Sequence, residues 1–189
     1  MIVVFSRFSL PWTRDDPYWD AFINRPPADP NNLLPHAFKQ VPGGGVNPIK
    51  TEVHSPNVMA AHVKELGRFY GADLVGIVER PNADPPFAIV SVLKTDHDTR
   101  TARGLGGQAP ALKSMFATFT LGAYIRELGY RASRVELPQA DHLAVVAGLG
   151  QLGPDGRLVT RRFGRRVHVA EVILTDLPLE PDGRESPRA

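Results

Sequence analysis

The 189-residue sequence contains no cysteine. Without thiols we expect no disulfide, no cysteine-ligated iron–sulfur cluster, no thiolate zinc site and no cysteine nucleophile in this chain. The sequence also carries little net charge, formally +2 at pH 7, although 22% of its residues are charged. A strongly basic, nucleic-acid-binding composition is therefore not indicated.

Long apolar runs are absent as well. No stretch reaches the roughly 20 apolar residues that span a bilayer. The opening "MIVVFSRFSLPWTRDD" has neither the basic lead-in nor the small-residue cleavage site of a signal peptide. We therefore expect a cytoplasmic protein without a membrane partner.

Three segments differ in composition. Residues 1–55 are rich in proline, asparagine and glycine but carry several aromatic side chains, which predicts an extended arm packed on some surface. Residues 56–180 hold the periodic apolar patterns of a folded domain, and residues 181–189 read as a flexible tail. The aromatic arm would also suit a homodimer interface.

The domain alternates helical and strand-like patterns. Ser55 and Pro56 predict a helix start, and a second, very apolar helix is expected from Pro110, after a flexible glycine-rich loop that could act as a lid. Strands are expected over residues 73–79, 87–94, 130–137 and 166–179, with a short helix over 141–147. These patterns predict an α/β (α+β) fold with helices packed on a mixed sheet.

Gly148, Gly150 and Gly153 form a literal GxGxxG pattern after an apolar run. A dinucleotide-binding turn would need a helix directly after the third glycine. The residues that follow, Pro154-Asp155-Gly156, instead favour a turn. Two interpretations stay open: a tight corner without a ligand, or a backbone surface that approaches a large flat ligand where any Cβ would collide.

The remaining polar residues give weaker indications. None of the six histidines has zinc-protease spacing, so we expect no metal site. His97 follows a strand and could contact a cofactor or lie in a solvated turn. A basic cluster in which Phe163 is the one nearby aromatic favours phosphate or carboxylate recognition, or a solvated strand edge, over nucleic acid. Its members are Arg157, Arg161, Arg162, Arg165 and Arg166.

The segment "AGLGQLGPDGRLVTRRFGRRVHVAEVILTDLPL" resembles a stretch shared by reductive dehalogenases and epoxyqueuosine reductase. Those families have an AGLG-x-x-G stretch, an apolar strand, a glycine, and a strand that ends in Thr-Asp-x-x-Leu. Upstream, "IKTEVHSPNVMAAHVKELGRFYGADLVGIVE" and "YIRELGYRAS" are similar to further family stretches. The resemblance covers about residues 49–180.

This resemblance implies a nitroreductase-like fold that binds cobalamin with its benzimidazole base detached from cobalt. The glycine stretch would offer backbone N–H groups to the cofactor tail. The implied cofactor-binding residues are Ala147, Gly148, Leu149, Gly150, Gln151, Leu152, Gly153, Arg157, Leu158, Val159 and His97. The dehalogenases use a tyrosine and the queuosine enzyme an aspartate as proton donor, which makes Tyr124, Tyr130 and Asp141 the catalytic candidates.

The resembling families also carry two cysteine-rich iron–sulfur motifs, which this sequence lacks. The resemblance therefore implies a stand-alone base-off cobalamin-binding protein for corrinoid-dependent reduction. Its electrons would come from a separate partner, such as a ferredoxin-like or flavin protein. Alternatives are a cobalamin carrier or processing protein without its own substrate, an FMN-dependent nitroreductase-like oxidoreductase, and a degenerate domain that only makes protein contacts. Whether the chain is a catalyst stays open.

Overall fold

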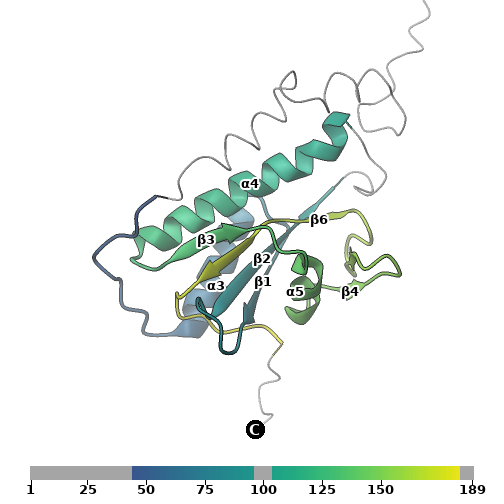
Figure 1. Ribbon diagram of the computed structural model, residues 1–189. Coiled ribbons are helices and arrows are strands. Elements are labelled where there is room, and N and C mark those ends of the chain that lie inside the picture. Colours follow the sequence, from purple (N-terminus) through teal and green to yellow (C-terminus); the bar gives the residue numbers. More distant parts are fainter. Residues whose placement is uncertain (1–43, 96–103, 184–189) are drawn as a thin grey trace, which may run out of the picture.

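The computed structural model describes residues 44–95 and 104–183 (Figure 1). Helices are interspersed with strands along this part of the chain, although β1 and β2, and later β4 to β7, follow one another without a helix between them. With the labels of Figure 1, the elements are α3 (Pro56–Phe69), β1 (Leu74–Glu79), β2 (Phe87–Lys94), α4 (Gly104–Glu127), β3 (Ala132–Val135), α5 (Ala140–Val146), β4 (Gln151–Leu152), β5 (Leu158–Val159), β6 (Val167–Val169) and β7 (Val172–Thr175).

Five strands form the main sheet, in the order β1-β2-β7-β3, with β6 also paired to β2. Strands β4 and β5 form a separate two-stranded hairpin. The predicted α/β class with helices on a sheet is confirmed. In the described residues each strand pairing is antiparallel, so the mixed sheet expected from the sequence is an antiparallel one.

Strands β6 and β7 follow one another along the same side of β2, and this side has one residue more than β2 between the two paired regions. Val92 lies opposite Val169, and Ile89 lies opposite Ile173. Three steps along β2 therefore face four steps along the partner, which defines a β-bulge around Ala170. Strand β3 pairs with β7 but not with β6, so regular pairing on this side of the sheet ends at the bulge.

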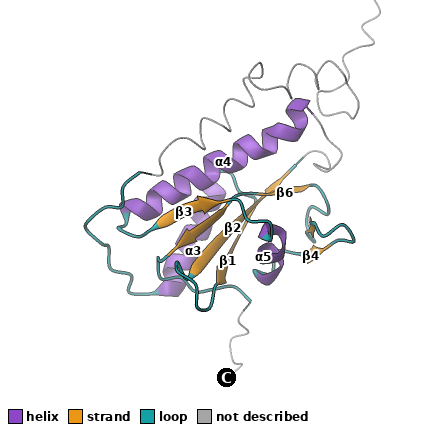
Figure 2. Ribbon diagram, in the orientation of Figure 1, coloured by secondary structure: helices purple, strands orange, loops and turns teal. Residues whose placement is uncertain are grey.

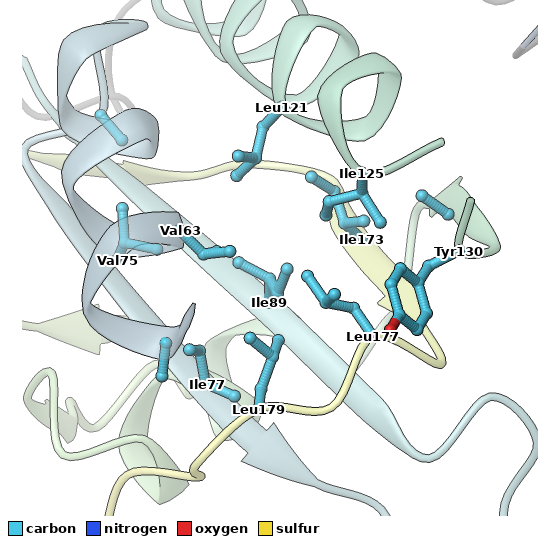
Figure 3. Close-up of a cluster of buried hydrophobic side chains, with 13 residues drawn as sticks. Val63, Val75, Ile77, Ile89, Leu121, Ile125, Tyr130, Ile173, Leu177 and Leu179 are labelled. Carbon is cyan, nitrogen blue, oxygen red and sulfur yellow. The ribbon is translucent and has the colours of Figure 1, made fainter. Parts of the chain in front are cut away.

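The two faces of the sheet carry separate cores. On one face, α3 and α4 pack over Ile89 and Ile173, with Val63, Leu121 and Ile125 filling the space between the layers (Figure 3). On the other face, α5 and the hairpin cover a second cluster that includes Ala88 and Val90 of β2. Successive β2 residues thus point to opposite cores, the period of two that a strand imposes. Figure 2 shows the strands between these layers.

The two long helices differ in how well the sequence predicted them. Helix α3 begins as expected, with the Ser55 hydroxyl accepting the Val58 N–H at 3.4 Å and Pro56 in the first turn. Helix α4 begins at Gly104, so Pro110 lies inside it and residues 104–110 are helical rather than a loop. Proline keeps a helical φ and removes one N–H donor, and burial of the rest of α4 offsets that local cost.

Helix α4 has 24 residues and is the longest helix of the described chain. No helix in residues 44–95 or 104–183 combines the length and apolar character needed to cross a membrane.

Past residue 180 the chain remains attached to the sheet. The Asp182 carboxylate accepts the Ile77 N–H at 2.8 Å, and the Asp182 N–H donates to the Ile77 carbonyl at 2.8 Å. The same carboxylate forms an ion pair with Lys64 of α3. The docked chain therefore extends into the segment that the sequence assigned to the tail.

We predict that Asp182→Ala lowers the free energy of unfolding by about 1–3 kcal/mol, because the Ile77 N–H loses its carboxylate acceptor. The matched variant Lys64→Met removes only a partly exposed ion pair and should cost about 1 kcal/mol or less. Urea unfolding followed by circular dichroism measures both. If both variants lost the same free energy of unfolding, the hydrogen bond from the Ile77 N–H would not be the larger contribution of Asp182 to stability.

Candidate functional site

The glycine stretch forms a β-hairpin, not a dinucleotide-binding turn. Helix α5 ends at Val146, Gly148 follows with φ +73°, and β4 and β5 then pair around a tight turn. In that turn the Gly153 N–H donates to the Arg157 carbonyl at 2.8 Å and the Gly156 N–H donates to the Gly153 carbonyl at 3.0 Å. The prediction that Pro154-Asp155-Gly156 forbids a following helix is confirmed.

Backbone conformation or close packing within the protein accounts for each of these glycines. Gly148 adopts the left-handed conformation that commonly ends a helix. A Cβ on Gly150 would lie 2.4 Å from the Val159 carbonyl oxygen, and one on Gly153 would lie 2.9 Å from the Asp155 carboxylate. On the neighbouring strand, a Cβ on Gly76 would lie 2.5 Å from the Ala147 Cβ. The glycines therefore allow the hairpin, α5 and β1 to pack closely against one another.

The backbone N–H groups of this stretch are also largely used internally. The Gly148 N–H donates to Val145 and the Leu149 N–H donates to Ala144, both at 2.9 Å, and the Gly153 N–H is bonded within the turn. These three donors are not available to a cofactor tail in this conformation. The sequence predicted that the N–H groups of this stretch face a ligand. For these three groups that prediction is wrong, because they form the hydrogen bonds that end α5 and close the hairpin turn.

A cavity of about 460 Å³ lies beside the hairpin, where β3 leaves the sheet. Its walls come from the N-terminal half of α4, the segment after β3, the start of α5, the hairpin turn, β6 and the bulge. The hydroxyl, imidazole and charged side chains that line it are Ser114, Glu136, Asp141, Asp155, Arg157, Arg165, His168 and Glu171. The cavity thus offers hydrogen-bond donors and acceptors of both charge signs.

Asp141 connects two walls of the cavity. It stands in the first turn of α5, and its carboxylate accepts the Leu158 N–H of β5 at 2.7 Å. A charged acceptor on a backbone N–H makes a stronger hydrogen bond than a neutral one. This contact fixes the position of the hairpin relative to α5.

The bulge wall is held by an ion pair. Arg134 of β3 reaches Glu171 at 3.4 Å, with side-chain exposures of only 11% and 13%. The Arg134 guanidinium also lies 5.2 Å from the centre of the Phe119 ring of α4. Because both side chains are largely shielded from water, we expect that breaking this ion pair would destabilise the wall.

His168 of β6 lies in the wall toward α4. Its Nε2 is 3.3 Å from the Ser114 hydroxyl. Burial lowers the pKa of the imidazole, the nearby Arg157 guanidinium lowers it further, and the Asp141 carboxylate opposes the shift. Burial and the Arg157 charge therefore both favour the neutral imidazole.

The structure brings together three of the predicted site residues. Asp141, Arg157 and Leu158 line the cavity. The other predicted cofactor residues in the described chain belong to the α5–hairpin unit but not to the cavity lining: Ala147, Gly148, Leu149, Gly150, Gln151, Leu152, Gly153 and Val159. His97 lies outside the described residues.

Neither predicted tyrosine reaches the cavity. The Tyr124 hydroxyl lies 3.0 Å from His62 Nε2, between α4 and α3, and the Tyr130 hydroxyl donates to the Thr51 carbonyl at 2.8 Å. Burial raises the pKa of both phenols. Both rings pack in or against the core cluster between the sheet and helices α3 and α4, so neither reaches the hairpin.

Sequence reasoning missed His168, Ser114, Glu136 and Glu171 as parts of one site. For His168 a signal existed, since it interrupts the apolar run of a predicted strand between Val167 and Val169. The place of Glu171 depends on the bulge, which no local pattern reveals.

The fold is similar to that of one part of the reductive dehalogenases. A solved reductive dehalogenase described as acting in B12-dependent dehalogenation superimposes with a TM-score of 0.66 at 24% identity, over 84% of this chain and 25% of that chain. The expected family likeness is confirmed at this level.

The sequence points to the same proteins. Tetrachloroethene reductive dehalogenases from Desulfitobacterium hafniense and Dehalobacter restrictus are 35% identical over 109 and 105 residues, covering 52% of this chain. No protein-family model matches. The chain is similar to a part of these reductive dehalogenases and spans 19% of the length of these curated proteins.

We predict that Gly150→Ala destabilises the protein by about 1–3 kcal/mol, because its Cβ meets the Val159 backbone rather than a movable side chain. Gly45→Ala is the matched control, since its Cβ would have no neighbour within 4 Å and its φ is not positive. Thermal unfolding of the two variants tests this. A Gly150→Ala protein as stable as the control would show that the hairpin relaxes at little cost.

Proposed function

We propose that this chain is a base-off cobalamin-binding protein that acts in corrinoid-dependent reduction with electrons from a separate partner. The observation that carries the proposal is the 35% identity to tetrachloroethene reductive dehalogenases. The fold supports it, since a solved neighbour is described as B12-dependent. Because this chain spans a small part of those proteins, the proposal takes from them the cofactor and the reaction class, and no particular substrate.

The cavity suits part of a corrinoid. A corrinoid carries carboxamide groups around its rim and one phosphodiester in its tail, so it needs acceptors, donors and a positive charge. The lining supplies carboxylates, a hydroxyl, an imidazole and two arginines. Its volume of about 460 Å³ is within the usual range for ligand pockets but smaller than a whole corrinoid, so the cavity would take the tail or one edge.

Side chains, rather than the glycine backbone, would hold the cofactor here. Arg157 and Arg165 are the cations at the cavity and would bind the phosphodiester. Glu136 and the Asp141 oxygen not bonded to Leu158 would accept carboxamide N–H groups. Leu158 adds an apolar wall. The bound cofactor would supply the reducible cobalt centre, and the chain's part is to bind it, orient it and limit water around it.

The proposed electron donor is a separate ferredoxin-like or flavin protein. The sequence has no cysteine with which to ligate an iron–sulfur cluster of its own. The groups at the cavity that could transfer a proton to a substrate are His168 and four carboxyl groups, those of Glu136, Asp141, Asp155 and Glu171. Asp141, already a candidate from the sequence, and His168 replace Tyr124 and Tyr130 as the first residues to test.

The deciding experiment mixes the purified chain with hydroxocobalamin under reducing conditions and records the visible spectrum. We expect binding with the spectrum of the base-off form. Ala111→Phe, which fills the cavity from α4, should weaken binding at least about tenfold, or roughly 1.4 kcal/mol. Ala123→Phe, on the same helix but outside the cavity lining, should bind as the parent does.

Other outcomes separate the alternatives. Tight FMN binding without cobalamin binding would replace the proposal with a nitroreductase-like oxidoreductase. Cobalamin binding that Ala111→Phe and Ala123→Phe affect equally would place the cofactor elsewhere on the chain. Cobalamin binding without turnover, when a ferredoxin and reductant are supplied with chlorinated ethenes, would favour a carrier.

A further inference from the structure

The Ser114 hydroxyl has two neighbours but only one hydrogen. Its Oγ lies 2.7 Å from the Ala111 carbonyl oxygen and 3.3 Å from His168 Nε2. A carbonyl oxygen cannot donate, so the hydroxyl hydrogen goes to Ala111. Ser114 must then accept from His168, and the hydrogen of the imidazole sits on Nε2.

The other ring nitrogen is therefore an acceptor. In a neutral imidazole with hydrogen on Nε2, Nδ1 carries a lone pair. Among the residues that the structure describes, His168 Nδ1 has no hydrogen-bond partner, while the side chain lines the cavity. A partly buried acceptor without a partner carries a desolvation cost that a bound donor would relieve.

We propose that His168 Nδ1 is the specificity-determining acceptor of this cavity and that it binds an uncharged N–H donor of the ligand, a carboxamide. This assignment rests on the proposed function, because corrinoids carry such carboxamides. Ser114 acts as a positioning residue, since its hydroxyl holds the hydrogen of His168 on Nε2. A carboxylate or phosphate has no N–H to give and would place an electron-rich oxygen against the Nδ1 lone pair. His168 Nδ1 therefore distinguishes amide from acid at its own position, while Arg157 and Arg165 would hold the phosphodiester.

Protonation of His168 would reverse this preference, because the imidazolium has two donors and no acceptor. The charged groups that face the cavity are Glu136, Asp141, Asp155, Arg157, Arg165 and Glu171, while α4 contributes no charge to the described lining. The His168→Gln variant separates the contribution of His168 to any pH dependence from theirs.

The first test measures the dissociation constant for hydroxocobalamin under reducing conditions from pH 5 to pH 8. In the parent protein the constant should rise as the pH falls below the usual histidine range, approaching about tenfold per pH unit below the His168 pKa. His168→Gln keeps an acceptor that cannot be protonated, so its constant should not vary. His142→Gln, on α5 but outside the cavity lining, is the control and should keep the parent's dependence.

The second test needs no cobalamin. Nitrogen-15 NMR of the free protein at pH 8 should show His168 with hydrogen on Nε2, and Ser114→Ala should give a mixture of both tautomers. Titration with propionamide should shift the Nδ1 resonance as that atom becomes hydrogen-bonded, while propionate should not. A Nδ1–H tautomer, or an equal response to amide and acid, would overturn the proposal.

The two tests distinguish failure of the His168 assignment from failure of the proposed function. A propionamide response without cobalamin binding leaves the His168 assignment intact and overturns the proposed function. Cobalamin binding with the same pH dependence in His168→Gln and the parent leaves the proposed function intact and overturns the His168 assignment.

Discussion

Strand β2 is the constraint on which the rest of the structure depends. Six consecutive residues of this strand are buried, it pairs with β1 on one side, and it pairs with both β7 and β6 on the other. A strand that is covered on both faces fixes the register of its neighbours, because a shift by one residue would exchange the two cores. The helices on either face therefore have little freedom in where they pack.

The cavity follows from a local exception to that regularity. The extra residue near Ala170 ends the pairing between β3 and the β6–β7 edge, and the space that opens is closed at its rim by α4 and the α5–hairpin unit. Asp141 and the Arg134–Glu171 ion pair hold these walls in place. The polar groups of the site thus come from segments far apart in the sequence.

Local chemistry explains which elements could be predicted. Ser55 with Pro56 marks the start of α3, and Pro154-Asp155-Gly156 marks the hairpin turn, because capping and turn preferences act within a few residues. The early start of α4, the bulge, and the orientation of Tyr124 and Tyr130 depend on packing between distant elements. Of the site, Asp141 and Arg157 were predicted from the family resemblance of the segments around the glycines. The Ser114–His168 contact joins residues 54 positions apart, beyond the reach of a local pattern.

The glycines show how one motif can support two readings. Their sequence pattern suggests a surface that accepts a ligand, and their geometry shows a surface that accepts neighbouring backbone. Both interpretations require the absence of a Cβ, so the sequence alone could not separate them. In this fold the glycines shape the hairpin, and the hairpin in turn contributes Arg157 and Leu158 to the cavity.

The contact between Asp182 and Ile77 also bears on self-association. Strand β1 lies at an end of the sheet, where unpaired backbone groups can recruit a strand from another molecule. Asp182 occupies both backbone groups of Ile77, and its ion pair with Lys64 places charged groups at the middle of that edge. The last described residues of the chain therefore act as a guard against edge-to-edge aggregation, a protection that the sheet would lose if this segment were cut away.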